Sequence, residues 1–119
     1  MRNTYGLPRI DRKGERVAAL LYKKKGFRIL RLNYKCRVGE IDVIAQKEGL
    51  LVFCEVKTRH NFKFGQPFEA VIARKQARIR MLAEIFIKNK AVDFVDVRFD
   101  VASVIAGEKY KIELIENAF

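Results

Sequence analysis

Three carboxylates and one lysine stand at spacings that would bring them together if two short segments of this chain formed paired β-strands. The segments cover residues 39–45 and 51–57, and each places ionisable side chains among apolar ones. Because side chains alternate along a strand, Glu55 and Lys57 share one face of the second segment, and Asp42 can face them from the first. A buried strand tolerates such groups only with a partner, a metal or a chemical role.

The turn between the segments sets their register. A hairpin that closes on residues 48–49 places Asp42 directly opposite Glu55. The same register places Glu40 opposite Lys57. Directly opposed side chains have Cβ atoms about 4.5–5.5 Å apart. Two carboxylates at that separation repel each other unless a cation lies between them, and hard divalent cations such as Mg²⁺ take oxygen ligands of this kind.

These residue types are suited to metal-assisted hydrolysis of a phosphodiester bond. Asp42, Glu55 and the backbone carbonyl of Val56 are candidate ligands for one or two Mg²⁺ (or Mn²⁺) ions, which would lower the pKa of a bound water. Lys57 would orient or deprotonate that water, or stabilise the pentavalent phosphorus centre. Glu15, at the edge of the apolar face of a predicted helix, is a further candidate carboxylate.

Each candidate also has a simpler interpretation. Glu55 and Lys57 could form an ion pair on a solvated sheet. Glu40 could pair with Lys57 or stand at the beginning of its strand. Glu15 could be a solvated helix residue. Lys75, which falls within the apolar stripe of the second predicted helix, could extend its amine to water.

The charge of the chain is uneven. Of the formal net charge of +11, residues 1–35 carry eleven Lys or Arg against two acids, and residues 72–90 carry six against one. Residues 36–71 are balanced, and residues 91–119 hold more acids than bases. Basic segments around a neutral, acid-bearing centre fit a bound polyanion, so we expect a nucleic-acid partner. The simpler alternative is that these bases only solvate helix surfaces.

Length and composition indicate a small globular protein. The chain has 119 residues, half of them apolar, which suits one compact domain. No apolar run is long enough to span a membrane and no signal-peptide pattern is present, so we expect a cytoplasmic protein without a membrane partner.

The cysteines and the histidine exclude other kinds of site. Cys36 and Cys54 fit a reducing compartment and lack zinc-finger spacing, and we expect Cys54 to be buried. His60 is the only histidine of the chain, which leaves almost no candidate residues for a Ser/His/Asp mechanism.

The expected elements follow the order α-β-β-β-α-β-β. Residues 1–10 are a basic arm, and residues 11–119 form a single domain with the layered arrangement of an α/β or α+β protein. Gly26 stands where a glycine ends a helix. Residues 58–67 form a polar loop. The expected helices cover 11–25 and 68–89, and the expected strands cover 27–34, 39–45, 51–57, 94–105 and 110–115.

Six motifs along the chain form a recognisable set. They are Gly14-Glu15, Gly39-Glu40-Ile41-Asp42, Phe53-Cys54-Glu55-Val56-Lys57-Thr58-Arg59, Phe64-Gly65-Gln66-Pro67, Arg98-Phe99-Asp100-Val101 and the closing Asn117-Ala118-Phe119. Together these motifs resemble the YraN-like family of bacterial proteins. This family is assigned to the restriction-endonuclease-like superfamily and is similar to archaeal Holliday-junction resolvases.

The resemblance implies a central mixed five-stranded sheet flanked by helices, with a magnesium-dependent nuclease site. By position, the acid and acid-x-lysine motif of the superfamily falls on Asp42 and on residues 55–57, and its helix-one glutamate falls on Glu15. Lys75 and Gln76 match the place of a supporting polar residue in the second helix. The implied nucleic acid is DNA rather than RNA.

Three functions are therefore compared. The first is a magnesium-dependent endonuclease acting on structured, possibly branched DNA. The second is a non-catalytic nucleic-acid-binding protein of the same fold, and the third is a small scaffold whose basic faces meet an acidic protein. Because resolvase-like proteins cut two strands symmetrically, we also expect a homodimer, with Phe94, Val95 and Tyr110 as interface residues.

Overall fold

The computed structural model describes residues 10–59 and 73–119, and the side chains from residue 13 onward. The basic arm up to residue 9, the loop residues 60–67 with His60, and the first predicted residues of the second helix lie outside this part of the chain. The predicted order α-β-β-β-α-β-β is confirmed. The elements are α1 (Ile10–Lys24), β1 (Arg28–Cys36), β2 (Gly39–Lys47), β3 (Leu50–Arg59), α2 (Ala73–Lys90), β4 (Asp96–Ile105) and β5 (Lys111–Ile115).

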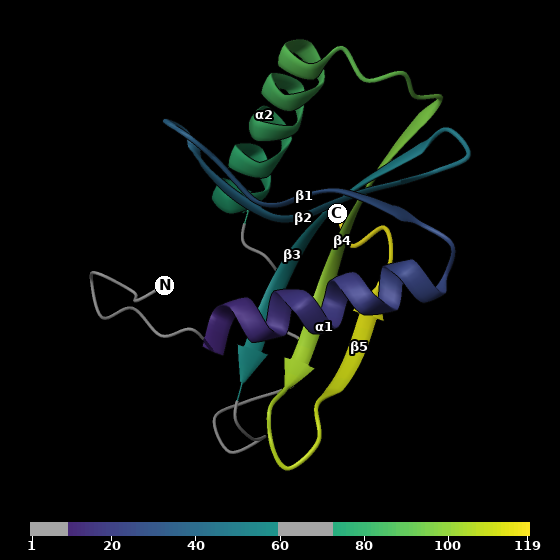
Figure 1. Ribbon diagram of the computed structural model, residues 1–119. Coiled ribbons are helices and arrows are strands. Elements are labelled where there is room, and N and C mark those ends of the chain that lie inside the picture. The colour runs from purple at the N-terminus through teal and green to yellow at the C-terminus, as the bar shows by residue number, and fades with distance from the viewer. Residues whose placement is uncertain (1–9, 60–72) are drawn as a thin grey trace, which may run out of the picture.

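The five strands form one mixed sheet in the order β1-β2-β3-β4-β5. All neighbouring pairs are antiparallel except β3 and β4, which run parallel. A parallel pair needs a long crossover connection, and the segment that contains α2 supplies it. The predicted mixed five-stranded sheet flanked by helices is confirmed (Figure 1). The assignment to the restriction-endonuclease-like superfamily stays a prediction.

The two helices cover opposite faces of β3, because the side chains of a strand alternate between its faces. On one face, Phe53 packs with α2 residues in a buried cluster. On the other face, Val52 and Cys54 pack with α1 residues in a second cluster, and Cys54 is buried as expected. The α2 residues of the first cluster are Ile79, Leu82, Ala83 and Phe86, and the α1 residues of the second are Ala18 and Tyr22.

The hairpin between β2 and β3 confirms the predicted register. Glu48 and Gly49 form the turn with positive φ angles of 49° and 87°, as two-residue hairpin turns require. Lys47 pairs with Leu50, and the pairing continues as far as Val43 with Cys54. Beyond that pair the two strands separate. Figure 1 shows β1 and β2 curling away from β3 toward α2.

This curl overturns two expectations about the register. The ladder between β2 and β3 ends at Val43 and Cys54, so Asp42 and Glu55 are not a directly opposed pair. Glu40 pairs with Lys35 of β1, so the prediction that Glu40 lies opposite Lys57 is wrong. The physical reason is the coiling of a long hairpin, which cannot follow β3 along its whole length while its end packs near α2. The curl opens the edge of β3 at the position of the predicted site.

Apart from the start of α2, the ends of the helices and strands lie within two residues of the predicted positions. α1 ends at Lys24 and is followed by the left-handed Gly26 with φ 96°, and the Phe27 N–H donates to the carbonyl of Tyr22. Phe94 and Val95 precede β4 instead of opening it, and the Val95 N–H donates to the carbonyl of Gly49.

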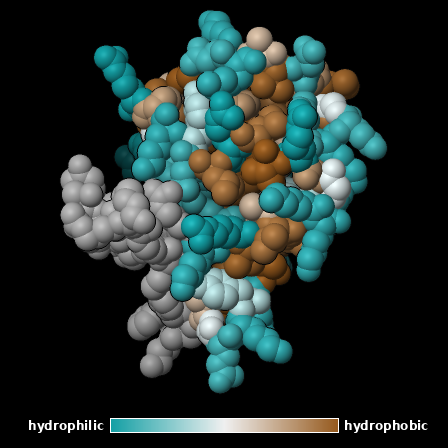
Figure 2. All heavy atoms as spheres, in the orientation of Figure 1, coloured by the Kyte–Doolittle hydropathy of each residue, from teal (hydrophilic) through white to brown (hydrophobic). Residues whose placement is uncertain are grey.

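Figure 2 shows an apolar strip between hydrophilic side chains on the face where α1 lies in front of the sheet. Val95 and Phe94 are 89% and 42% exposed, whereas Tyr110 is half-buried. Their role in a homodimer stays a prediction. Within residues 10–59 and 73–119, neither helix is long and apolar enough to cross a membrane.

Candidate metal-binding site

The candidate site lies where β2 leaves β3. Past Cys54, the β3 backbone has no β2 partner in the ladder. The Val56 N–H instead donates to Asp42 Oδ2 at 2.7 Å. The Asp42 side chain therefore takes the place of the missing strand backbone, and this bond anchors one of its oxygens beside β3.

Two further carboxylates meet Asp42 at this point. Ligand oxygens of Glu15 on α1, and of Glu40 and Asp42 on β2, all lie within 4.8 Å of one another. Glu15 is only 6% exposed, Asp42 is half-buried and Glu40 is exposed. Opposite ligands of an octahedral Mg²⁺ are about 4.2 Å apart. Small side-chain rotations would bring these three oxygens onto one ion, so the donor chemistry and the spacing fit a hard divalent cation.

The electrostatics of Asp42 show that a fourth acid belongs to the group. The pKa of Asp42 is raised to about 8, first by burial and then by the neighbouring carboxylates of Glu55, Glu15 and Glu40, in that order. The hydrogen bond from Val56 N–H opposes this rise. Like charges gathered in a half-buried place disfavour ionisation, and a bound cation would reverse that balance.

Gly14 allows α1 to bring Glu15 to the sheet. A Cβ atom at Gly14 would collide with the hydroxyl of Thr58 on β3, and would also meet the side chain of Val56. Only a glycine therefore permits this close approach. The sequence carried a signal for this role, because an isolated glycine inside a helical pattern often marks close packing.

Glu55 has a different neighbour from the one that strand alternation predicts. Its Oε2 lies 2.6 Å from the Lys75 ammonium of α2. Glu55 is 8% exposed, whereas the side chain of Lys75 is 41% exposed. Both residues line a cavity of about 220 Å³, together with Glu40, Asp42 and Arg78. Lys75 thus points into the site rather than only to water, and Arg78 adds a second cation that the residue pattern did not reveal.

Lys57 lies two residues beyond Glu55 on β3. It is half-buried, opposite Ser103 of β4, and is not among the residues that line the cavity. The structure therefore places Asp42 and Glu55 at one cavity and Glu15 beside Asp42, whereas Lys57 belongs to neither group. The catalytic role of Lys57 and the role of the Val56 carbonyl as a ligand stay predictions.

The comparison with known proteins now bears on this geometry. The profile of the uncharacterised protein family UPF0102 matches residues 14–104, which include all the acids of the site. The chain belongs to the UPF0102 family. This agrees with the resemblance drawn from the motifs.

Three UPF0102 proteins illustrate the similarity. The relative from Dictyoglomus thermophilum is 47% identical over 113 residues, covering 92% of this chain and 96% of the relative. That from Dictyoglomus turgidum is 44% identical with the same coverage. That from Alkaliphilus metalliredigens is 45% identical over 106 residues, covering 89% of this chain and 93% of the relative.

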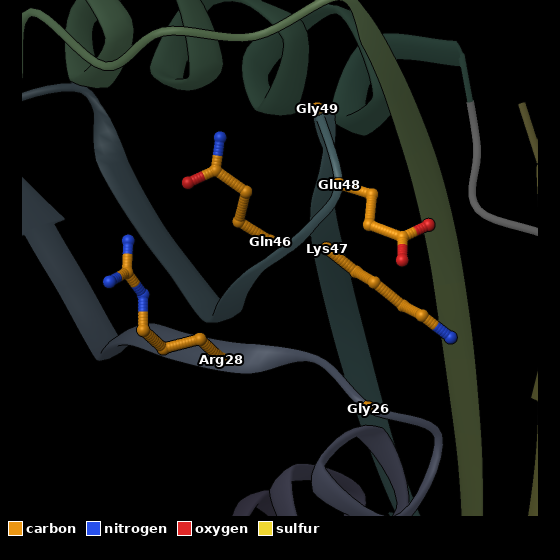
Figure 3. A pocket seen from close by; sticks show the side chains of 6 residues that line it. All are labelled: Gly26, Arg28, Gln46, Lys47, Glu48 and Gly49. Carbon is orange, nitrogen blue, oxygen red and sulfur yellow. The ribbon is translucent and has the colours of Figure 1, made fainter.

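This UPF0102 protein has a second hollow at the other end of the β2–β3 hairpin, roughly 17 Å along β2 from Asp42 by strand geometry. It measures about 390 Å³ and is lined by Gly26, Arg28, Gln46, Lys47, Glu48 and Gly49 (Figure 3). Lys47 donates to the carbonyl of Lys25 at 2.7 Å, and Gln46 donates to that of Asp93 at 2.6 Å. Because these polar groups already have partners, the larger hollow is a weaker candidate site than the acidic cavity.

A different acid of this UPF0102 chain is fully buried and fully matched. Asp100 on β4 is 0% exposed. Tyr22 donates to its Oδ2 at 2.6 Å, and the Asn117 N–H donates to its Oδ1 at 2.9 Å. Arg98 donates to both oxygens, at 2.9 and 3.0 Å. Sequence reasoning noted Asp100 only within a motif, and this network ties α1, β4 and the C-terminal segment together.

Proposed function

We propose that this protein is a magnesium-dependent endonuclease that hydrolyses phosphodiester bonds of structured DNA. One observation carries the proposal: Glu15, Glu40, Asp42 and Glu55 converge from three elements, and burial together with their mutual repulsion raises the pKa of Asp42. Four acids gathered at one half-buried point do not stabilise the folded state, because burial and like charges both disfavour their ionised forms. Perturbed carboxylates in a cleft are the usual mark of a functional site.

Each residue of the site would have its own role in the reaction. Asp42, Glu15 and Glu40 would hold the ion, with Glu55 as a further ligand. When bound, Mg²⁺ supplies a water of lowered pKa and stabilises charge on the phosphate. Val56 N–H keeps Asp42 in place, and Lys57, two residues beyond Glu55 on β3, would orient the attacking water.

The substrate class follows from the charge around the acids. Arg78 lines the cavity, Arg74 is exposed one turn earlier on α2, and Arg37 is exposed in the turn that leads to Gly39. Cations at the rim would bind phosphates on either side of the scissile bond, and such contacts release counterions. The net charge of +11 favours the same partner.

The test is a cleavage assay with branched, flapped, nicked and linear DNA in Mg²⁺ or Mn²⁺, with an RNA strand for comparison. Wild type should cut at least one substrate, and Asp42→Asn and Glu55→Ala should bind DNA but lose cleavage by at least about 100-fold. Glu84→Gln, which alters an exposed acid of α2, is the matched control and should cut normally. Wild type that cuts no substrate with either metal would reject the enzyme.

A second candidate is a non-catalytic nucleic-acid-binding protein of the same fold. It is favoured by the partners that two acids already have: Glu55 pairs with Lys75, and Asp42 accepts the Val56 N–H. In that case wild type and Glu55→Ala would bind DNA equally and neither would cut. Failure of both to bind any nucleic acid at low salt would leave only the scaffold function.

A further inference from the structure

Lys75 occupies the side of Glu55 that faces the acidic cavity. Its ammonium lies 2.6 Å from Glu55 Oε2, within a space that Asp42 and Glu40 also line. The carboxylate is nearly buried while the lysine side chain is 41% exposed. The pair therefore joins a fixed acid to a cation that can reach solvent.

We infer that Lys75 is an internal counter-ion that a divalent cation replaces at Glu55. This inference rests on the proposed function and adds a positioning residue to it. In the metal-free protein the ammonium holds Glu55 and offsets part of the charge of the four acids. Metal binding at Asp42 and Glu55 would then require the ammonium to leave.

Geometry and charge support the replacement. A Mg²⁺ ion about 2.1 Å from a Glu55 oxygen would lie only about 4–5 Å from an ammonium still bound to that carboxylate. A double and a single positive charge at that separation repel strongly where water is partly excluded. The Lys75 side chain is already 41% exposed, so the ammonium can turn toward solvent when it leaves Glu55. Lysine is suited to this movement, because its charge is carried on a flexible four-carbon stem.

The inference can be tested without cleavage, by titrating Mn²⁺ or Mg²⁺ into the protein alone and measuring the heat of binding. Lys75→Gln should tighten metal binding by about tenfold, because the competing cation is gone. Arg78→Gln is the matched control: it removes the same charge from the same helix and cavity, but Arg78 pairs with no acid among the described residues. It should tighten binding by less than about threefold. Lys75→Arg keeps a competing cation and should stay closer to wild type than Lys75→Gln.

A spectroscopic measurement separates replacement from simple charge removal. The ammonium of Lys75, observed by nitrogen NMR, should show an ion-paired signal without metal and lose it when Mg²⁺ saturates the site. Thermal unfolding in the same buffers shows whether Lys75→Gln is folded. If that variant does not fold, the signal of Lys75 in wild type decides the question alone.

The outcomes distinguish this inference from the nuclease proposal. Weaker or unchanged metal affinity in Lys75→Gln, or an ammonium signal that persists with metal, overturns the inference even if wild type cuts DNA. Tighter affinity with loss of the signal supports it even if no substrate is cut. If neither wild type nor Lys75→Gln binds either metal, the inference and the metal-dependent proposal both fall.

Discussion

Asp100 is a buried acid of the sheet and Asp42 a half-buried one, and their surroundings are built in opposite ways. Asp100 accepts hydrogen bonds from the Tyr22 hydroxyl, from Nε and Nη2 of the Arg98 guanidinium and from a backbone N–H. Asp42 accepts one backbone N–H, and three other carboxylates surround it. The surroundings of Asp100 stabilise its negative charge, whereas those of Asp42 disfavour it.

This difference separates an acid that holds the fold from an acid that is available for chemistry. A buried charge stabilises a structure only when its partners match it. The Asp100 network meets that condition and joins segments distant in the chain. Asp42 has one N–H donor and several carboxylate neighbours, and a divalent cation would offset the negative charge gathered there.

The largest effect is expected from breaking the matched network. Asp100→Ala leaves the Arg98 charge and the Tyr22 hydroxyl without their common acceptor, so we expect a loss of about 3–5 kcal/mol in the free energy of unfolding. Denaturant titration of this variant measures it. The exposed Asp93→Ala serves as control and should change stability by less than about 0.5 kcal/mol. A small effect of Asp100→Ala would erase the contrast between the two acids.

The next effect concerns the pH dependence that Asp42 gives the metal-free protein. Its pKa is raised from 3.8 to about 8, so between these values the folded protein binds more protons than the unfolded chain. Stability should therefore fall as pH rises through this window, by up to several kcal/mol.

Asp42→Asn tests this directly, because its amide stays neutral and its oxygen can still accept the Val56 N–H. The variant should be more stable than wild type at pH 8 and show a flatter profile of melting temperature between pH 5 and pH 8. Parallel profiles of the two proteins would show that the pKa of Asp42 is not raised in the folded protein.

A smaller effect is expected at the helix that carries Glu15. Gly14→Ala places a methyl group against the Thr58 hydroxyl, so α1 must shift, at a cost of about 1–3 kcal/mol. Adding Thr58→Ala should recover part of the loss, and a double-mutant cycle measures that coupling. Strict additivity of the two changes would mean that this contact does not position Glu15.

The smallest effect is expected at the basic rim. Arg37→Gln and Arg74→Gln should each weaken DNA binding modestly and reduce the slope of log affinity against log salt by about 1. Fluorescence anisotropy at several salt concentrations measures the slope. Lys109→Gln, an exposed cation between β4 and β5, is the control, and an equal effect there would indicate a diffuse charge instead of a rim.

Local sequence was sufficient to predict much of the sheet. The turn at Glu48 and Gly49 and the alternation of side chains set the register that pairs Val43 with Cys54, and they directed Asp42 and Glu55 toward one another. The glycine at position 26 marked the end of α1. These features depend on neighbours within a few residues, which a sequence shows directly.

Contacts between distant segments were not accessible in the same way. Alternation placed Glu40 against Lys57, but the curl of β1 and β2 turned Glu40 toward Glu15 and Asp42. The pairing of Lys75 with Glu55 depends on how deeply α2 packs on the sheet. A pattern of residues does not contain these distances, because they result from fitting whole surfaces together.

The sequence by itself determined which elements form, how β2 and β3 pair, and that an aspartate and a glutamate meet at the end of their shared ladder. Only the tertiary structure decided which other groups join them: two further acids and a lysine, with Lys57 outside the cavity. The reason is physical. Periodicity and turn geometry are local, whereas sheet curvature and helix packing are set by the burial of surfaces far apart in the chain.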